Sequence, residues 1–162
     1  MFWLVVESED AERKMDGADV LKHGQKIRCF LGVFELADLA KLNIVKNNVS
    51  LIVIHNEHAI AIFCGLDQVE VFDPFGLEGR NFGNRQILDV VCGFLKEHLP
   101  CKSLRINTSI QSSGSQKCAY FCLVYLFFRC RGYTFGDVVN LFSCNLQEND
   151  KRVEELFNLH FH

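Results

Sequence analysis

The sequence predicts a single α+β domain, spanning residues 1–162, in which a small, mostly antiparallel sheet packs between helices. Three β-rich segments, 49–55, 58–64 and 68–73, follow one another with only short turns between them. The segment that begins at Cys118 is apolar nearly all round, which indicates a central buried helix. A chain of 162 residues with 49% hydrophobic residues is long enough for one core and too apolar to be disordered.

The remaining elements follow from local patterns. Asn84 and Thr134 suit helix N-caps, because their side chains can accept hydrogen bonds from the first turn. After Asn84, apolar residues such as Ile87, Val91 and Leu95 recur on one helical face. In chain order we expect a helix over 8–23, broken at Gly17 and ended by Gly24, a strand over 27–34, a helical turn over 35–42, the three β-rich segments, a helix from 85 to about 99, a strand over 103–107, and helices over 118–131, from 134 to about 144 and over 149–159.

The segments 58–64 and 68–73 should pair as an antiparallel hairpin. Gly65-Leu66 suits a two-residue type II′ loop, because glycine takes its first position. In that register His58 lies directly opposite Asp73, with Cβ atoms about 4.5–5.5 Å apart. A carboxylate there would hold the imidazole in one tautomer and one orientation. A three-residue loop would shift the register by one and weaken this pairing.

Gln111 and Cys118 lie at the two ends of the loop that precedes the apolar helix. At a helix N-terminus a cysteine faces unpaired N–H groups and the positive end of the helix dipole, which favours the thiolate. The same N–H groups can stabilise a tetrahedral oxyanion, and Gln111 can add a side-chain donor. The chain thus carries, in order, a base, a carboxylate, an amide donor and a nucleophile for a cysteine hydrolase: His58, Asp73, Gln111 and Cys118.

Each of these residues has a simpler interpretation when taken alone. A single cysteine such as Cys118 is more often a buried structural residue, and Asp73 can be a turn residue. His55 is a rival base, but His58 begins the alternating strand and matches Asp73 in register, so we prefer His58. The coincidence of all four residue types in this order and spacing favours the catalytic interpretation.

The net charge of −3 gives no general reason to expect nucleic-acid binding. The apolar opening, residues 1–6, is shorter than the core of a signal peptide and runs into acidic residues, so we expect a protein that is not secreted. Its eight cysteines should then be mostly free, small buried hydrophobes rather than disulfides. They lack the paired CxxC units of a zinc site, so no metal is expected. The longest apolar run, Cys118–Phe128, is too short to span a bilayer.

At these residues the chain resembles the adenovirus protease (adenain) family, cysteine proteases related to the SUMO-protease clan. The resemblance implies that His58 is the general base, Asp73 its carboxylate partner, Cys118 the nucleophile and Gln111 an oxyanion-hole donor. Of the two loop glutamines, Gln111 and Gln116, only Gln111 has the family spacing to the cysteine. The matching strings are His58-Ala-Ile-Ala-Ile-Phe, Val71-Phe-Asp-Pro-Phe-Gly76, Ser109-Ile-Gln-Ser-Ser-Gly-Ser-Gln-Lys-Cys118 with Tyr120-Phe-Cys122, and Cys29-Phe-Leu-Gly.

Three positions depart from the family pattern. Ala59 stands where the family usually has a tryptophan directly after the catalytic histidine, so one wall of the site differs. Ala119 follows the nucleophile, where the family prefers glycine. Asp73 is the carboxylate, as in SUMO proteases, whereas adenain mostly has glutamate. None of these changes removes a catalytic group, but they bear on how substrate fits.

The resemblance implies an adenain-like endopeptidase fold over the whole chain and cleavage of virion precursor proteins at small, Gly-containing sites. Such an enzyme would act in the virion and inside the host cell, in the nucleus, and its chemistry would need no cofactor. Two alternatives stay open: an isopeptidase acting on a ubiquitin-like modifier that ends in Gly-Gly, and an inactive relative that only binds partners.

In the adenovirus enzyme a short activating peptide is attached to a cysteine through a disulfide. The resemblance therefore implies Cys101 as a candidate attachment point for such a peptide in this chain. Cys101 follows Leu99-Pro100 at a helix end and precedes Gln111 by ten residues. An exposed thiol beside an edge strand could accept an added peptide strand and then bind it covalently. A free cysteine without a partner is the simpler interpretation. DNA as a co-activator is less favoured still, given the net charge.

Overall fold

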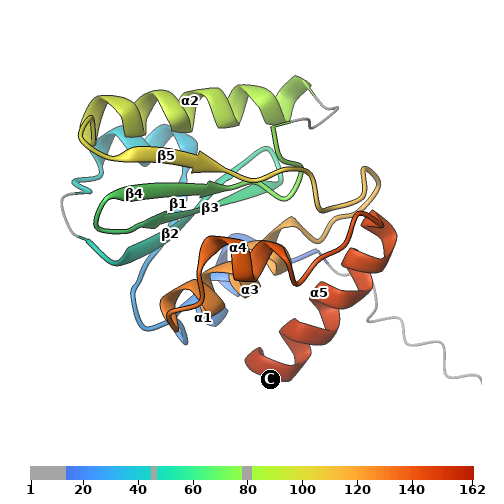
Figure 1. The fold of residues 1–162 in the computed structure, drawn as a ribbon. Coiled ribbons are helices and arrows are strands. Elements are labelled where there is room, and N and C mark those ends of the chain that lie inside the picture. Colours follow the sequence, from blue (N-terminus) through green and yellow to red (C-terminus); the bar gives the residue numbers. More distant parts are fainter. Residues whose placement is uncertain (1–13, 45–46, 78–81) are drawn as a thin grey trace, which may run out of the picture.

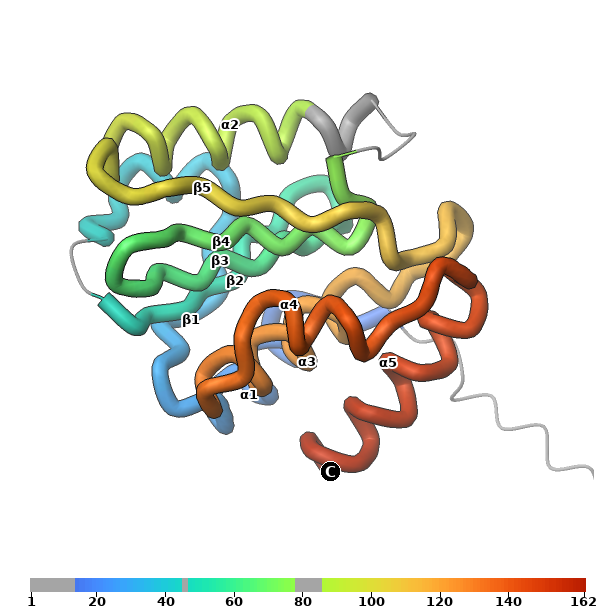
Figure 2. The backbone as a smooth tube through the Cα atoms, in the orientation of Figure 1, coloured from blue at the N-terminus to red at the C-terminus, as the bar shows by residue number. Residues whose placement is uncertain are grey.

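The computed structural model describes residues 14–44, 47–77 and 82–162, and a five-stranded sheet forms its centre (Figures 1 and 2). Its strands are β1 (Phe30–Glu35), β2 (Val49–His55), β3 (His58–Cys64), β4 (Gln68–Phe72) and β5 (Ser103–Ile106), side by side in chain order. β3 pairs antiparallel with both β2 and β4, whereas β1 and β5 pair parallel with their neighbours. The α+β class is confirmed, with a mixed sheet that is antiparallel in the middle and parallel at both edges.

Helices cover both faces of the sheet (Figure 1). They are α1 (Gly17–Gly24), the 3-10 helix η1 (Leu36–Lys41), α2 (Phe82–His98), α3 (Cys118–Cys130), α4 (Phe135–Val139) and α5 (Leu146–Phe161). α2 and η1 pack on the face that carries Ile60, Ile62 and Val71. α3 packs on the other face, against Ala59 and Ala61, and α1, α4 and α5 surround it. Within the described ranges, no helix is long and apolar enough to cross a membrane.

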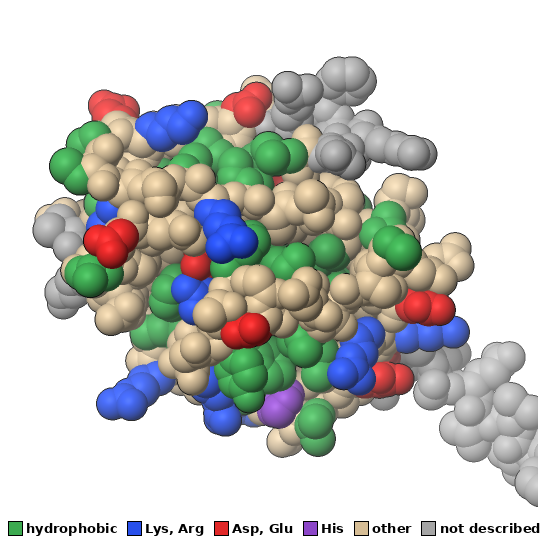
Figure 3. Space-filling model, in the orientation of Figure 1, with side chains coloured by type: hydrophobic (Ala, Val, Ile, Leu, Met, Phe, Trp, Pro, Cys, Tyr) green, Lys and Arg blue, Asp and Glu red, His purple; other side chains and the backbone are tan. Residues whose placement is uncertain are grey.

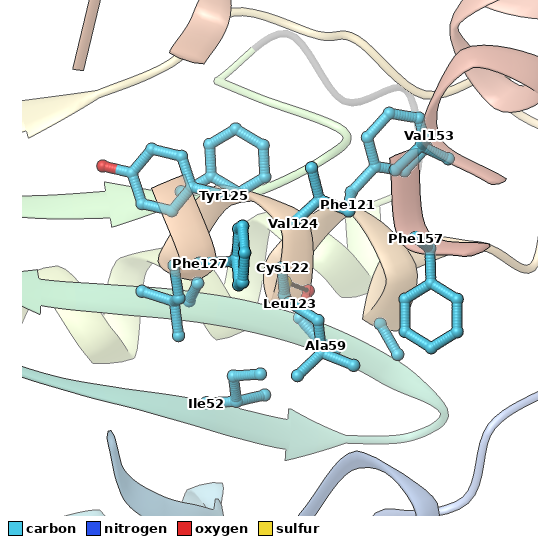
Figure 4. Close-up of a cluster of buried hydrophobic side chains, with 14 of the residues drawn as sticks. Ile52, Ala59, Phe121, Cys122, Leu123, Val124, Tyr125, Phe127, Val153 and Phe157 are labelled. Atoms are coloured by element: carbon cyan, nitrogen blue, oxygen red, sulfur yellow. Dashed lines mark hydrogen bonds between the residues drawn. The ribbon is translucent and has the colours of Figure 1, made fainter. Parts of the chain in front are cut away.

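The expected central helix is α3, and its interior side chains are almost all buried (Figure 4). Tyr125 is fully buried and stacks on Phe72 of β4, with ring centroids 4.2 Å apart. The Tyr125 hydroxyl donates to Glu70, and Arg129 donates two hydrogen bonds to the same carboxylate, each 2.7 Å long. A buried acid is thus paired with a cation and a hydroxyl, as burial of a charge requires. This network fixes α3 lengthwise on the sheet.

Two helix starts differ from the sequence prediction. α2 begins at Phe82, so Asn84 lies within its first turn instead of capping it. α5 begins at Leu146, because Asn145 is the N-cap and its side chain accepts the N–H of Glu148. In both cases an asparagine lies close to the start of the helix. The sequence alone did not show which residue is the N-cap of the helix.

α1 and α4 also differ in extent. α1 begins at Gly17, where we expected a break, because Asp16 caps it in a reciprocal capping box with Asp19. The predicted helix residues 8–13 lie outside the described residues. The Thr134 cap of α4 is confirmed, with the N–H of Asp137 donated to its side chain, but α4 ends at Val139, before residue 144.

The hairpin of β3 and β4 forms in a different register from the predicted one. Ile62 pairs with Val71, not with Val69, and the N–H of Gly65 donates to the carbonyl of Gln68 at 2.9 Å. The chain therefore reverses at residues 66–67, one residue later than expected. The resulting shift of two residues keeps every side chain on its predicted face, whereas a shift of one would have reversed them.

Cys29 and Cys130 form a disulfide that the sequence analysis did not expect, whereas the other six cysteines are free, as was expected of most of them. The Cα atoms of Cys29 and Cys130 are 6.3 Å apart although 101 residues separate them. Only the packing of the C-terminal end of α3 beside the start of β1 brings them together, so no local spacing indicates the pair. The free cysteines are buried at positions 64, 118 and 122, half-buried at 92 and exposed at 101 and 144.

Charged side chains of both signs are interspersed on the face drawn in Figure 3. Hydrophobic side chains lie among them in small groups. That face therefore presents no surface of a single sign. Among the residues that the structure describes, no group of three His, Cys, Asp or Glu side chains could hold a metal ion.

Candidate active site

The four candidate residues stand at the ends of elements that meet at one edge of the molecule. His58 is the first residue of β3, Asp73 directly follows β4, and Cys118 is the first residue of α3. Gln111 lies in the loop between β5 and α3. All four are buried: the exposed fraction is 4% for His58, 1% for Asp73, 6% for Cys118 and 1% for Gln111.

His58 and Asp73 form a hydrogen bond although they are not directly opposite in the ladder. The Nε2 of His58 donates to the Oδ1 of Asp73 at 2.8 Å, and both side chains are buried. Because Asp73 lies beyond the last ladder pair, its side chain is free to reach diagonally back to His58. The N–H of Phe75 donates to the same Oδ1 at 2.9 Å, and the Phe75 ring lies 5.1 Å from the imidazole. The carboxylate and the ring together fix one orientation of His58.

The pKa of His58 is shifted by opposing effects. Burial, the largest effect, lowers the pKa, but the hydrogen bond and charge of Asp73, together with the nearby sulfur of Cys118, outweigh it and raise the pKa to about 9. The imidazole is therefore protonated at neutral pH. Nε2 is bonded to Asp73, and Nδ1 has no hydrogen-bond partner within the described part of the chain, so Nδ1 is the nitrogen left for the thiol.

The thiol of Cys118 is held beside the β2–β3 turn. Its Sγ lies 3.7 Å from the carbonyl oxygen of Glu57, the residue before His58. Asn56 and Glu57 both have positive φ (46° and 67°), as a two-residue type I′ turn requires. The N-cap residue of α3, Lys117, makes no side-chain hydrogen bond to the first turn, so the first N–H groups of the helix remain available to a negatively charged oxygen.

Gln111 is positioned by the turn after Asp73. Its backbone N–H and that of Ile110 both donate to the carbonyl of Pro74, each at 3.0 Å. Its side-chain Nε2 donates to the carbonyl of Ser115 at 2.8 Å, and its buried Oε1 has no partner among the residues that the structure describes. An amide carries two N–H donors, so one of them is left to meet an oxyanion.

α5 holds the outer side of this loop. Asn149, buried at 1% exposure, donates to the carbonyl of Ile110 at 2.9 Å. Further on, Lys117 forms an ion pair of 2.7 Å with Glu154. The loop that carries Gln111 is thus anchored at both ends to a helix more than thirty residues away in sequence.

Asn107 is a site residue that the sequence analysis missed. Its side chain is buried, accepts the N–H of Asp73 at 2.8 Å and donates to the carbonyls of Asp73 (2.6 Å) and Thr108 (2.8 Å). It therefore fixes the backbone of the carboxylate residue. The one available signal was an amide side chain at the end of a predicted strand, at the level where the Asp73 strand also ends.

The rival and secondary candidates are placed differently. His55 is half-buried at the end of β2, pairs with His58 only through the backbone ladder and has no hydrogen bond to Asp73. Gln116 is exposed, whereas Gln111 is buried. Cys101 is exposed in the turn between α2 and β5, and β5 is an edge strand of the sheet. That placement suits an added strand, but attachment of a peptide stays a prediction.

Comparison with solved structures shows the fold. The central domain of the uncharacterized Lpg1148 protein from Legionella pneumophila superposes with a TM-score of 0.55 at 13% identity, covering 92% of this chain and 98% of that one. The SUMO protease Ulp1, with its catalytic cysteine oxidized to a sulfenic acid, superposes with a TM-score of 0.50 at 11% identity, covering 94% and 81%. Neither a protein-family model nor a curated protein matches the sequence.

The chain therefore has a cysteine protease or isopeptidase-like fold, with a mixed sheet and helices arranged as in Ulp1. Identities this low show the fold alone. Membership of the adenain family, and the roles of the four site residues, remain predictions from the sequence.

Proposed function

We propose that the protein is a cysteine hydrolase that cleaves peptide bonds, with Cys118 as nucleophile, His58 as base and Asp73 as the group that orients the base. The observation that carries the proposal is the buried hydrogen bond between His58 and Asp73, beside a cysteine at the uncapped start of a helix. Gln111 is proposed as an oxyanion donor, since it is buried in the loop that leads into the same helix.

In the proposed reaction the proton of the Cys118 thiol lies on His58 before the substrate is attacked, as the raised pKa of that imidazole favours, and the sulfur then attacks the substrate carbonyl carbon as the thiolate. The oxyanion that forms is stabilised by the Gln111 side chain and the first N–H groups of α3. His58 then gives its proton to the leaving amine as the C–N bond breaks, which leaves an acyl group on the sulfur. Water, giving a proton to His58, attacks the acyl carbon, and departure of the sulfur restores the thiolate beside the protonated His58.

The substrates that the sequence resemblance favours are precursor proteins of a double-stranded DNA virus or a related virus-like transposable element. Cleavage would follow small, Gly-containing motifs, in the virion or the nucleus of the host cell. A peptide activator attached at Cys101 belongs to the same proposal, and nucleic acid is a less favoured activator because the net charge is −3.

The likeness to Ulp1 favours a second candidate, cleavage of a ubiquitin-like modifier from its conjugates. Both reactions use the same acyl-enzyme chemistry and differ in the group that is released. The two candidate functions are separated by a panel of substrates. It contains virion precursor proteins and conjugates of ubiquitin-like modifiers that end in Gly-Gly. Preferential release of free modifier would replace the endopeptidase proposal.

The first experiment is labelling with a peptidyl electrophile that reacts with activated thiols. Wild type and Cys144→Ser, which removes an exposed thiol, should be labelled, and Cys118→Ser should not. His58→Ala should abolish hydrolysis, whereas His55→Ala should retain most of it. Absence of labelling would make the protein a binding relative without activity. A dead His55→Ala together with an active His58→Ala would move the base to His55.

A further inference from the structure

A cavity of about 290 Å³ opens beside the thiol of Cys118. Its inner walls include the apolar side chains of Met15, Ile54, Ala59 and Ala119. Ala59 of β3 and Ala119 of α3 are both buried, and Ala59 lies beside α3 in Figure 4. Because both side chains are single methyl groups, space remains between the strand, the helix and the segment that leads into α1.

The rim of the cavity is charged but balanced. Lys14 forms an ion pair of 2.9 Å with Glu57, in which the lysine side chain is 28% exposed and the glutamate 83%. Asp16, also on the rim, accepts the N–H of Asp19 as the cap of α1. Among the described residues, the entrance therefore offers no unpaired cation that would select an acidic group. A group that passes the rim gains mainly by moving from water to an apolar surface.

The position of the cavity indicates what enters it. In an acyl-enzyme the substrate carbonyl carbon is bonded to the Cys118 sulfur, and Cys118 and Ala119 both line the cavity. The bond between the Cys118 sulfur and this carbonyl carbon fixes the position of the substrate residue that supplies the carbonyl. Because Cys118 lines the cavity, the side chain of that substrate residue lies next to the cavity. An engineered apolar cavity of about 150 Å³ holds benzene, so this one can hold a leucine, methionine or phenylalanine side chain.

We propose that this cavity is the subsite for the residue that supplies the attacked carbonyl, and that it selects an apolar side chain of leucine to phenylalanine size over glycine. The inference rests on the proposed hydrolase function, and it revises the expected glycine preference at this one position. The departure from the family pattern at Ala59 gives the physical reason, since a tryptophan there would add a large side chain to the wall of this space.

The test uses peptidyl vinyl sulfones, which present only the acyl side of a substrate and react irreversibly with the thiol. A series with glycine, alanine, leucine, phenylalanine, aspartate or lysine in the reacting position is compared by its second-order inactivation rate. We expect the leucine and phenylalanine probes to react at least about tenfold faster than the glycine probe, the scale for a hydrophobic subsite. Ala59→Leu and Ala119→Leu, two independent fillings of the cavity, should each reduce this ratio towards one.

Ala40→Leu is the matched control, because Ala40 is exposed on η1, which packs on the other face of the sheet. It should keep the wild-type ratio. A glycine probe that reacts as fast as the leucine probe in wild type would overturn the inference and leave the hydrolase proposal intact. A leucine preference that survives both filling variants would also overturn it. Alkylation of Cys118 itself by iodoacetamide, together with no reaction of any peptidyl probe, would instead overturn the proposed function, and the inference with it.

Discussion

Asn107→Ala should weaken both the stability and the activity of the protein. The side chain makes three hydrogen bonds, one to the N–H of Asp73 and two to the carbonyls of Asp73 and Thr108. A buried polar group left unsatisfied costs about 1–3 kcal/mol, and water that enters the vacated space recovers part of this. We therefore expect the free energy of unfolding to fall by about 2–4 kcal/mol, measured by urea denaturation.

The effect on activity follows from the position of the carboxylate. Release of the Asp73 backbone displaces the partner of His58, and a displacement of about 1 Å in such a site can cost about 100-fold in rate. The loss should appear in kcat, with little change in KM, and the alkaline limb of the pH–rate profile should move to lower pH. Asn107→Asp retains one acceptor but places a carboxylate against two carbonyls, so it should not restore activity.

Thr108→Ala is the control for this prediction, because Thr108 is exposed and a surface substitution is usually neutral within about 0.5 kcal/mol. If Asn107→Ala kept kcat within about twofold of wild type, with an unchanged pH profile, Asn107 would be structural only. A loss of stability alone, without movement of the alkaline limb, would lead to the same conclusion.

Four further predictions concern separate parts of the molecule. Because the pKa of His58 is raised from 6.5 to about 9, its stabilising contribution is present in full below pH 6.5 and is lost as pH rises through 9, so unfolding free energy should fall by about 3 kcal/mol over that range. His58→Gln should remove this dependence, and an equal slope in the variant would refute it. Gln111→Ala should lower kcat by about 10²–10³ with little change in KM, and a loss confined to KM would assign Gln111 to substrate binding. Arg129→Ala leaves the buried Glu70 carboxylate without its cation and should cost about 3–5 kcal/mol in urea denaturation, whereas a cost below about 1 kcal/mol would show the pair to be unimportant. Cys29→Ser, which opens a disulfide across 101 residues, should cost up to about 4–5 kcal/mol, and a reductant should bring wild type to the same value but leave the variant unchanged.

The local elements could be predicted from the sequence because their signals are local. The β-rich composition of 49–55, the alternation in 58–64 and the apolar run from Cys118 gave β2, β3 and α3 with nearly the right bounds. Helix starts were less certain, because a capping side chain and its neighbours look alike in sequence. The start of α5 at Leu146 shows this, since Asn145 and Asn149 are both plausible caps and Asn149 instead bonds to Ile110.

Features that join distant segments could not be predicted. The Cys29–Cys130 disulfide depends on how α3 lies beside β1, and the Asn107 contacts depend on β5 running parallel to β4. The contact between His58 and Asp73 was expected through a register that proved wrong by two residues. An even shift keeps the side chains on one face, and Asp73 beyond the strand end could still reach the imidazole.

The turn after β4 links the two halves of the proposed catalytic centre. On one side it holds Asp73, and on the other the carbonyl of Pro74 accepts the backbone N–H groups of Ile110 and Gln111. Gly76 makes this close approach feasible: its φ is +63°, and a Cβ there would lie 2.2 Å from the backbone nitrogen of Ser109. Because one turn positions both the carboxylate of Asp73 and the amide of Gln111, a disturbance at Gly76 would displace these two side chains together. Glycine at position 76 is therefore a geometric requirement of this turn, which accounts for the value of the Pro-Phe-Gly string after Asp73 as a sequence signal.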